Sequence, residues 1–261
     1  MEEKEIIRRK QDGIGRITIN RPEKMNTFTL SIIKDIIAAF EDMERDENVK
    51  VIVLAGAGET AFCTGGDIEE FARILPYPSK FREYYDHFDR LAHTMKNMGK
   101  PIVAEINGLC VGGGIEIESF CDISIASENA RFGLVGARAG ILEIYALPSL
   151  IGIIGQKRAK YQIFTGILWD ARKAEDIGLI SKVVPPERLK EEVIKVARKI
   201  MANGPSALRM AKTMLNFDSD QRYPMVTHAR EILSHYLSTE ESKEGFRAFL
   251  EKRDPVWKKQ G

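Results

Sequence analysis

The stretch Asn107-Gly-Leu-Cys-Val-Gly112-Gly113-Gly114-Ile-Glu116 places three consecutive glycines shortly after an apolar run, Ile102-Val-Ala-Glu-Ile106, that predicts a β-strand. Glycines at a strand-to-helix turn let the backbone approach a ligand, and the first N–H groups of the helix lack intrahelical partners. Such groups can stabilise an oxygen anion. Because Glu116 falls in the first helical turn, the stretch indicates either an anion site beside a reactive carboxylate or a tight helix–sheet contact with a charge at the helix start.

A second glycine-rich turn follows another apolar run. The run Val51-Ile-Val-Leu-Ala55 has the length and composition of a buried parallel strand. It leads into Ala61-Phe-Cys-Thr64-Gly65-Gly66-Asp67-Ile68, in which paired glycines precede a predicted short helix. The chain therefore uses the same type of turn twice.

Strand and helix patterns alternate along the first part of the chain. Strand-like segments lie near residues 14–20, 51–55, 102–106 and 122–126, with helical spacing between them. This order favours an α/β spiral of layered strand–strand–helix units over a two-domain dinucleotide-binding enzyme. The glycine turns do not match G-x-G-x-x-G, and neither a Walker A lysine motif nor G-x-S-x-G occurs in the sequence.

Beyond Gly152 the apolar spacing becomes mostly helical, over residues 156–165, 171–177, 187–201, 206–215 and 222–250, the last of which is expected to break once. We predict one domain with a spiral core over residues 1–200, which carries the site, and a helical C-terminal region over residues 201–261. Since these helices need a surface to pack against, we expect the C-terminal region to serve in oligomerisation and to cover the site.

Composition excludes several classes of protein. The 261 residues are 44% hydrophobic and 30% charged, with a formal net charge of +1, which gives no sign of a nucleic-acid partner. The three cysteines lack metal-ligand spacing, and their odd number argues against a disulfide framework. No apolar run is long enough to span a membrane, and the N-terminus does not have the pattern of a signal peptide. We therefore expect a soluble, reduced, cytoplasmic protein without a membrane partner.

Several short motifs occur along the chain in an order and spacing that match a known protein family. They run through Arg21-Pro-Glu-Lys24-Met25-Asn26, Ala61-Phe-Cys-Thr-Gly-Gly-Asp-Ile68, Asn107-Gly108 through Glu116, Cys121-Asp122, Phe132-Gly133, Gly155-Gln-Lys-Arg-Ala159, Thr165-Gly166, Ala171-x-x-Ala174-x-x-x-Gly178-Leu179 and Glu244-Gly-Phe through Arg253. In this order and spacing, over nearly the whole chain, they resemble the crotonase (enoyl-CoA hydratase/isomerase) superfamily.

The resemblance implies a spiral of ββα units, a helical C-terminal region and a homotrimer or dimer of trimers. It implies an acyl-CoA thioester as substrate, with coenzyme A as part of that substrate and no separate cofactor or metal. It also implies an oxyanion hole whose donors, by motif position, are the backbone N–H groups of Gly66 and Gly113. Two such donors would stabilise the negative charge that forms on a thioester oxygen, each by roughly 3–4 kcal/mol.

Other positions are implied to bind the substrate. Those that match the coenzyme A groove or its glycine turns are Lys24, Met25, Ala61, Thr64, Gly65, Gly66, Asp67, Ile68, Gly112 and Gly113. Lys252 matches a basic position that some members use for the coenzyme A phosphates.

The sequence departs from the two-glutamate pattern of the hydratases. Glu116 matches their first glutamate, but the segment that should carry the second reads Phe132-Gly-Leu-Val-Gly136. The naphthoate synthases and 2-ketocyclohexanecarboxyl-CoA hydrolases also have glycine there, with an aspartate seven residues later, where this chain has Glu143. Unlike this chain, that group has an apolar residue at the position of Glu116.

Three functions follow from this hybrid pattern. The first is an enoyl-CoA hydratase for a 2-enoyl-CoA or cyclic dienoyl-CoA, with Glu116 as main acid and base and Glu143 as a partner. The second is naphthoate-synthase-like or hydrolytic carbon–carbon chemistry on a β-keto acyl-CoA, with Glu143 in the aspartate role. The third is a catalytically weak acyl-CoA-binding protein. Glu143 could instead face solvent or a neighbouring subunit, and Glu118 is interpreted as structural because it points away from Glu116 on a helix.

Overall fold

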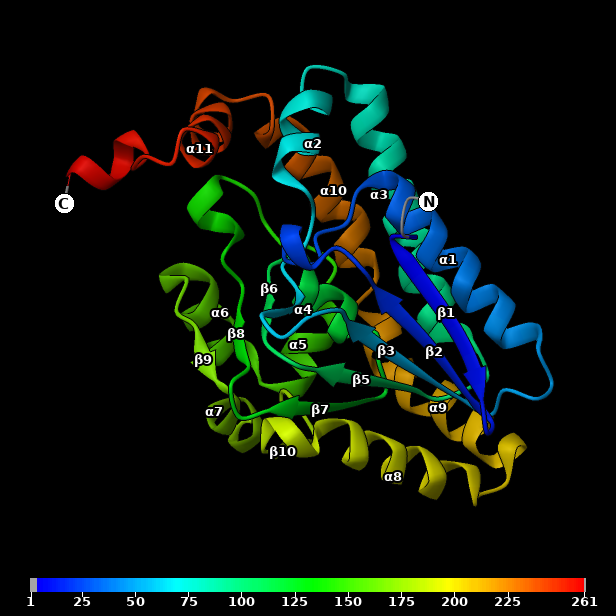
Figure 1. Ribbon diagram of the computed structural model, residues 1–261. Coiled ribbons are helices and arrows are strands. Elements are labelled where there is room, and N and C mark those ends of the chain that lie inside the picture. The colour runs from blue at the N-terminus through cyan, green and yellow to red at the C-terminus, as the bar shows by residue number, and fades with distance from the viewer. Residues whose placement is uncertain (1–3, 261) are drawn as a thin grey trace.

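The larger of two sheets organises the fold (Figure 1). The computed structural model describes residues 4–260. The strand order is β1-β2-β3-β5-β7-β10, in which β1 and β2 form an antiparallel hairpin and the other pairs are parallel. The strands are β1 (Ile6–Gln11), β2 (Ile14–Ile19), β3 (Val51–Gly56), β5 (Ile102–Ile106), β7 (Ile123–Ser127) and β10 (Lys182–Val184).

Helices cover both faces of this sheet, so its central strands read as continuous apolar runs. Val51 and Val53 face α8 (Leu189–Met201), which contributes Val193 and Ala197 to that contact. Alternate residues such as Leu54 point into the main core, where α1 (Leu30–Arg45) and α3 (Pro78–Asn97) pack. The mixed α/β class that the sequence predicts is thus confirmed.

The smaller sheet positions the glycine turns. Its order is β4-β6-β8-β9, formed by β4 (Ala61–Cys63), β6 (Leu109–Val111), β8 (Arg131–Gly133) and β9 (Trp169–Asp170). The first three strands are parallel, so their carboxyl ends meet at one edge. From that edge the chain enters α2 (Ile68–Ile74), α4 (Gly113–Glu118) and the 3-10 helix η2 (Gly136–Ala139). The sheet therefore brings the two predicted glycine turns together with the Gly136 segment.

The C-terminal part of the chain is helical, as predicted. It contains α5 (Leu147–Ile153), α6 (Gln156–Thr165), α7 (Ala171–Asp176), α9 (Pro205–Gln221), α10 (Pro224–Tyr236) and α11 (Glu240–Leu250), with short 3-10 helices at Pro186–Arg188 (η3) and Val256–Gln260 (η4). A further 3-10 helix, η1 (Pro22–Lys24), lies between β2 and α1. The predicted break within 222–250 falls between α10 and α11. No helix in the described part of the chain is long and apolar enough to span a membrane.

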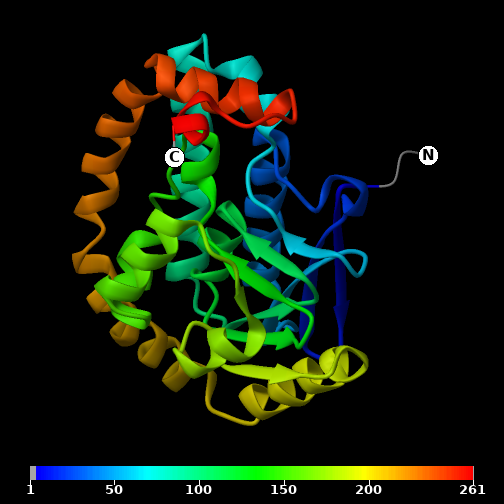
Figure 2. The ribbon, with the colours of Figure 1, turned by 90° about the vertical axis from the view of Figure 1, so that its left-hand side faces the viewer.

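Helix α11 closes back onto the body of the molecule beside α2 and η2 (Figure 2). The Ser242 hydroxyl is buried and donates to the Gly140 carbonyl oxygen (3.1 Å). A Cβ atom at Gly245 would lie 2.5 Å from the Ala139 carbonyl oxygen, so the helix backbone rests directly on the end of η2. Residues far apart in the sequence thereby form one wall.

The contact between α4 and β4 depends on a missing side chain. A Cβ atom at Gly114 would lie only 2.1 Å from the Cys63 carbonyl oxygen. We expect Gly114→Ala to lower the free energy of unfolding by about 3 kcal/mol or more, because two backbones must separate. Gly204→Ala is the control, since its Cβ would have 3.9 Å of clearance and the cost there should be about 1 kcal/mol or less. Urea unfolding of both variants measures the difference, and equal losses would contradict the close-packing argument.

Candidate active site

A single cavity of about 740 Å³ opens beside the three aligned turns. Its walls come from both ends of the chain as well as from the centre. The lining residues are Glu23, Lys24, Met25, Thr27, Phe28, Thr64, Gly66, Asp67, Ile68, Glu69, Phe71, Tyr84, Tyr85, Phe88, Val111, Gly112, Gly113, Glu116, Val135, Gly136, Arg138, Ala139, Ile141, Leu142, Glu143, Phe249, Leu250 and Lys252. Most of this surface is apolar, so a few polar groups would fix the position of a ligand.

Two backbone N–H groups are free at the cavity wall. The turns touch, since a Cβ atom at Gly65 would lie 2.5 Å from the Gly113 nitrogen. Gly65 has a φ of 93°, in the left-handed region that favours glycine. Among the described residues, the N–H groups of Gly66 and Gly113 donate to no backbone acceptor. Both glycines line the cavity, so the two unpaired donors belong to its wall.

Glu116 is buried in the first turn of α4, and its two oxygens have different surroundings. The backbone N–H of Tyr145 donates to Oε1 (2.7 Å) and fixes the carboxyl group. Oε2 lies near Gly113, 3.4 Å from where a Cβ atom would stand. The carboxyl group is thus held by one oxygen, and its other oxygen lies beside a free backbone donor.

Glu143 stands in the space beside Gly136. The Gly136 N–H donates to Glu143 Oε1 (2.6 Å), and a Cβ atom at Gly136 would lie 2.8–2.9 Å from the carboxyl atoms of Glu143. Oε2 is buried without a hydrogen-bond partner in the described part of the chain. Glu143 is 6% exposed and lines the cavity, so the alternative of a solvent-facing side chain is wrong.

Burial raises the pKa of both carboxyl groups. The pKa of Glu116 rises to about 8, first because burial disfavours the charged form and second because Glu143 is negatively charged nearby. Burial raises the pKa of Glu143 to about 7, against the opposing effect of the Gly136 hydrogen bond. A pair of this kind holds one proton and one charge near neutral pH, which suits general acid–base chemistry.

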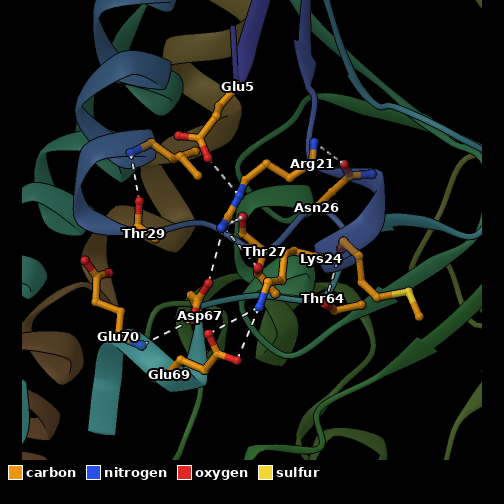
Figure 3. A network of polar contacts seen from close by, with 12 residues as sticks. Glu5, Arg21, Lys24, Asn26, Thr27, Thr29, Thr64, Asp67, Glu69 and Glu70 are labelled. Atoms are coloured by element: carbon orange, nitrogen blue, oxygen red, sulfur yellow. Dashed lines mark hydrogen bonds and ion pairs between the residues drawn. The ribbon is translucent and has the colours of Figure 1, made fainter. Parts of the chain in front are cut away.

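A polar network holds the rim of the cavity near η1 (Figure 3). Asp67 pairs with Arg21 (3.3 Å) and also accepts from the Glu70 N–H at the start of α2. Lys24 pairs with Glu69 (3.2 Å), and both side chains are exposed. Asp67 therefore has a structural role in addition to its place in the wall, whereas Lys24 is free to exchange its partner.

Most residues that the sequence singles out for the site lie at this cavity. Ala61 and Gly65 are absent from its lining. Ala61 is buried in β4, where its carbonyl oxygen accepts from the Asn26 side chain, and Gly65 packs against Gly113 behind the surface. Glu118 is buried on the same short helix as Glu116 but bonds Ser124 away from the cavity, in agreement with its structural interpretation.

The sequence interpretation missed an aromatic part of the wall. Tyr84, Tyr85 and Phe88 reach the cavity from α3, and Phe28 and Phe71 complete this side. An apolar stripe at helical spacing identifies these α3 residues as buried, but it does not distinguish a cavity wall from an ordinary core contact.

The family model for enoyl-CoA hydratase/isomerase matches residues 9–260. The chain belongs to the enoyl-CoA hydratase/isomerase family. This confirms the crotonase superfamily, whereas the narrower resemblance to naphthoate synthases stays a hypothesis.

Solved enoyl-CoA hydratase/isomerase structures share the fold over nearly the full length. An enoyl-CoA hydratase from Mycobacterium avium subsp. paratuberculosis K-10 is 27% identical, with a TM-score of 0.85 and coverage of 97% of this chain and 98% of that chain. An enoyl-CoA hydratase from Bacillus anthracis is 32% identical, with a TM-score of 0.78 and the same coverage. A carnitinyl-CoA hydratase from Mycobacterium avium is 27% identical, with a TM-score of 0.84 and coverage of 98% and 99%.

Proposed function

We propose that the protein catalyses the reversible addition of water to a 2-enoyl-CoA or cyclic dienoyl-CoA thioester. The observation that carries the proposal is the position of Glu143, whose carboxyl group fills the space next to Gly136. A second glutamate at that position is the pattern of the hydratases. Here the carboxyl group reaches the same place from a residue further along the chain, and it faces one cavity together with Glu116.

The two carboxyl groups divide the chemistry of the addition. Glu143 has the lower pKa of the pair, so it is the carboxyl group that is deprotonated near neutral pH, and it removes a proton from the attacking water. The water oxygen bonds to carbon 3 of the acyl group, the double-bond electrons move toward the thioester, and an enolate forms. The N–H groups of Gly66 and Gly113 stabilise its oxygen, and protonated Glu116 then delivers a proton to carbon 2.

The coenzyme A part is proposed to lie at the open end of the cavity. Lys24 and Lys252 line it from opposite ends of the chain, and both ammonium groups suit phosphate oxygens. Met25, Thr64 and Ile68 lie along the same wall. Release of Lys24 from Glu69 costs little because that ion pair is exposed.

A mass-spectrometric screen of saturated, enoyl, cyclic dienoyl and β-keto acyl-CoAs tests the proposal. Gain of one water on an enoyl or dienoyl substrate is the expected result. Cleavage or ring closure of a β-keto acyl-CoA instead would favour the carbon–carbon alternative. Binding without turnover of any of these compounds would leave only an acyl-CoA-binding protein.

The paired carboxyl groups predict a bell-shaped dependence of kcat/KM on pH. At low pH both groups are neutral and no base is available, and at high pH both are charged and no acid is available. We expect a maximum between about pH 7 and 8, the pKa values of the pair. In Glu143→Gln the acid limb should disappear, and the alkaline limb should move to lower pH because the nearby charge is lost. Loss of enoyl absorbance across a pH series measures both limbs, and an unchanged profile in Glu143→Gln would contradict the pairing.

Self-association is proposed as well. The exposed large apolar side chains of α6 and α9, among them Phe164, Met214 and Leu215, support association between copies of the chain, for which we propose the homotrimer or dimer of trimers that the resemblance implies. Light scattering coupled to size-exclusion chromatography tests this state.

A further inference from the structure

The hydroxyl group of Tyr84 is a buried polar group without a function in the chemistry described so far. Tyr84 lies on α3 and is 2% exposed. Its oxygen has no hydrogen-bond partner in the described part of the chain. A buried hydroxyl without a partner costs about 1–3 kcal/mol, so such a group indicates a partner that binds later.

The position of this hydroxyl connects it to the site. A Cβ atom at Gly66 would lie 2.9 Å from the Tyr84 oxygen, so the phenol points at the turn that carries one of the free N–H groups. Tyr84 also lines the cavity. The hydroxyl therefore lies next to the Gly66 turn at the cavity wall.

The surroundings hold the ring in this orientation. Phe71 packs edge-on against it, with ring centroids 4.8 Å apart, and Tyr85 packs edge-on from the other side at 5.8 Å. Burial raises the pKa of the hydroxyl well above its usual value, so it remains a protonated donor. A fixed donor needs no reorganisation when charge develops on an acceptor.

Tyr145 and Tyr223 differ in this respect. The Tyr145 hydroxyl donates to the Tyr85 carbonyl oxygen (3.0 Å), and the Tyr223 hydroxyl donates to Asp89 (2.6 Å). Tyr145 is buried and Tyr223 is half-buried, and both hydroxyls have protein partners. Within the described residues the Tyr84 hydroxyl has none, although it is as buried as Tyr145.

We propose that Tyr84 is a further catalytic residue, whose hydroxyl donates a third hydrogen bond to the thioester oxygen beside the N–H groups of Gly66 and Gly113. The inference rests on the proposed function only in taking an acyl-CoA thioester as the ligand. The third donor strengthens the polarisation of the thioester carbonyl and stabilises the enolate oxygen that forms when the acyl group reacts.

Tyr84→Phe tests the assignment because it removes the hydroxyl and keeps the ring in its packing. The first readout is the infrared carbonyl stretch of bound butyryl-CoA labelled with ¹³C at carbon 1, a saturated thioester that cannot be hydrated. In the wild type we expect this band at lower frequency than in solution. In Tyr84→Phe the downshift should shrink, and kcat on crotonyl-CoA should fall about 10²-fold with little change in KM.

Two matched variants separate this role from a structural one. Tyr85→Phe makes the same deletion on the neighbouring cavity residue, near Glu116 and Glu143, and should leave the carbonyl band unchanged. Tyr161→Phe makes it on the exposed surface of α6 and should change neither readout. Replacement of Tyr84 by 3-fluorotyrosine, a stronger donor, should enlarge the downshift and does not depend on the folding of the phenylalanine variant.

The outcomes are distinct from those of the hydratase test. A carbonyl band that is equal in wild type and Tyr84→Phe would overturn the assignment, whatever happens to turnover. A smaller downshift in the variant, in a protein that hydrates no enoyl-CoA, would support the third donor while refuting hydration. Failure of the wild type to bind butyryl-CoA or any other acyl-CoA of the screen would refute both.

Discussion

Glu116→Gln is expected to lower kcat for enoyl-CoA hydration by about 10³-fold, since the variant cannot supply or accept the proton at carbon 2. The amide keeps the size of the carboxyl group, and its oxygen can still accept from the Tyr145 N–H that holds Glu116. Substrate affinity should therefore change little. Stopped-flow turnover of crotonyl-CoA and calorimetric titration with butyryl-CoA measure the two quantities separately.

The chain offers a close control for this change in Glu118→Gln. Glu118 is buried two residues further along α4, and burial raises its pKa to about 7, but it bonds Ser124 rather than facing the cavity. The control should keep turnover within a few-fold of the wild type. Equal losses in the two variants would show that the effect comes from the packing of α4, and full turnover in Glu116→Gln would remove this residue from the mechanism.

The second large effect should come from removing the Glu143 carboxyl group and then restoring a carboxyl group at residue 136. Glu143→Ala removes the proposed base, and we expect a loss of about 10²-fold in kcat. The same change empties the space that a side chain at residue 136 needs, since a Cβ there would lie 2.8–2.9 Å from the Glu143 carboxyl atoms. In the double variant Glu143→Ala/Gly136→Glu the carboxyl group should return to the cavity, and kcat should rise at least about 10-fold above that of Glu143→Ala.

The single variant Gly136→Ala, which keeps Glu143, tests whether the Glu143 carboxyl group needs the space next to residue 136. It should displace the Glu143 carboxyl group and lose activity, whereas Gly136→Ala combined with Glu143→Ala should fold without strain. Thermal unfolding and steady-state kinetics are measured for the wild type, Glu143→Ala, Gly136→Ala and the double variant Gly136→Ala/Glu143→Ala, which together form a double-mutant cycle. A double variant with the glutamate at residue 136 that is no faster than Glu143→Ala would refute the idea that the carboxyl group acts from that place.

The sequence was sufficient for the parts of the fold that have strong periodic patterns. Helix α1 begins and ends where its apolar spacing does, and β3 is the buried strand that its apolar run predicts. The strands β4, β6 and β8 are three residues long, too short for a period to be seen, yet they align the turns that line the cavity. Only the pairing of parallel strands in space explains why Gly66, Gly113 and Gly136 meet.

The site was predictable where chemistry depends on local sequence and less so where it depends on packing. The free N–H groups and Glu116 follow from glycine turns at helix starts. The direction of the Glu143 side chain depends on the loop after η2. This loop has no helical or strand periodicity from which the direction of a side chain could be predicted. Tyr84 belongs to a helical apolar stripe whose pattern would be the same in an ordinary core. Both proposed roles rest on the three-dimensional structure: the Glu143 carboxyl group fills the space beside Gly136, and the buried Tyr84 hydroxyl has no hydrogen-bond partner among the described residues.

The contact of α11 with η2 makes the cavity wall depend on a helix that is synthesised after all strands of both sheets. Phe249, Leu250 and Lys252 complete the cavity wall, and Ser242 and Gly245 rest on the turn that ends beside the Glu143 segment. A chain cut short before α11 keeps all strands of both sheets and both glutamates, but it lacks this part of the cavity wall. We therefore expect such a translation product to fold in part and to bind an acyl-CoA more weakly than a chain that contains α11.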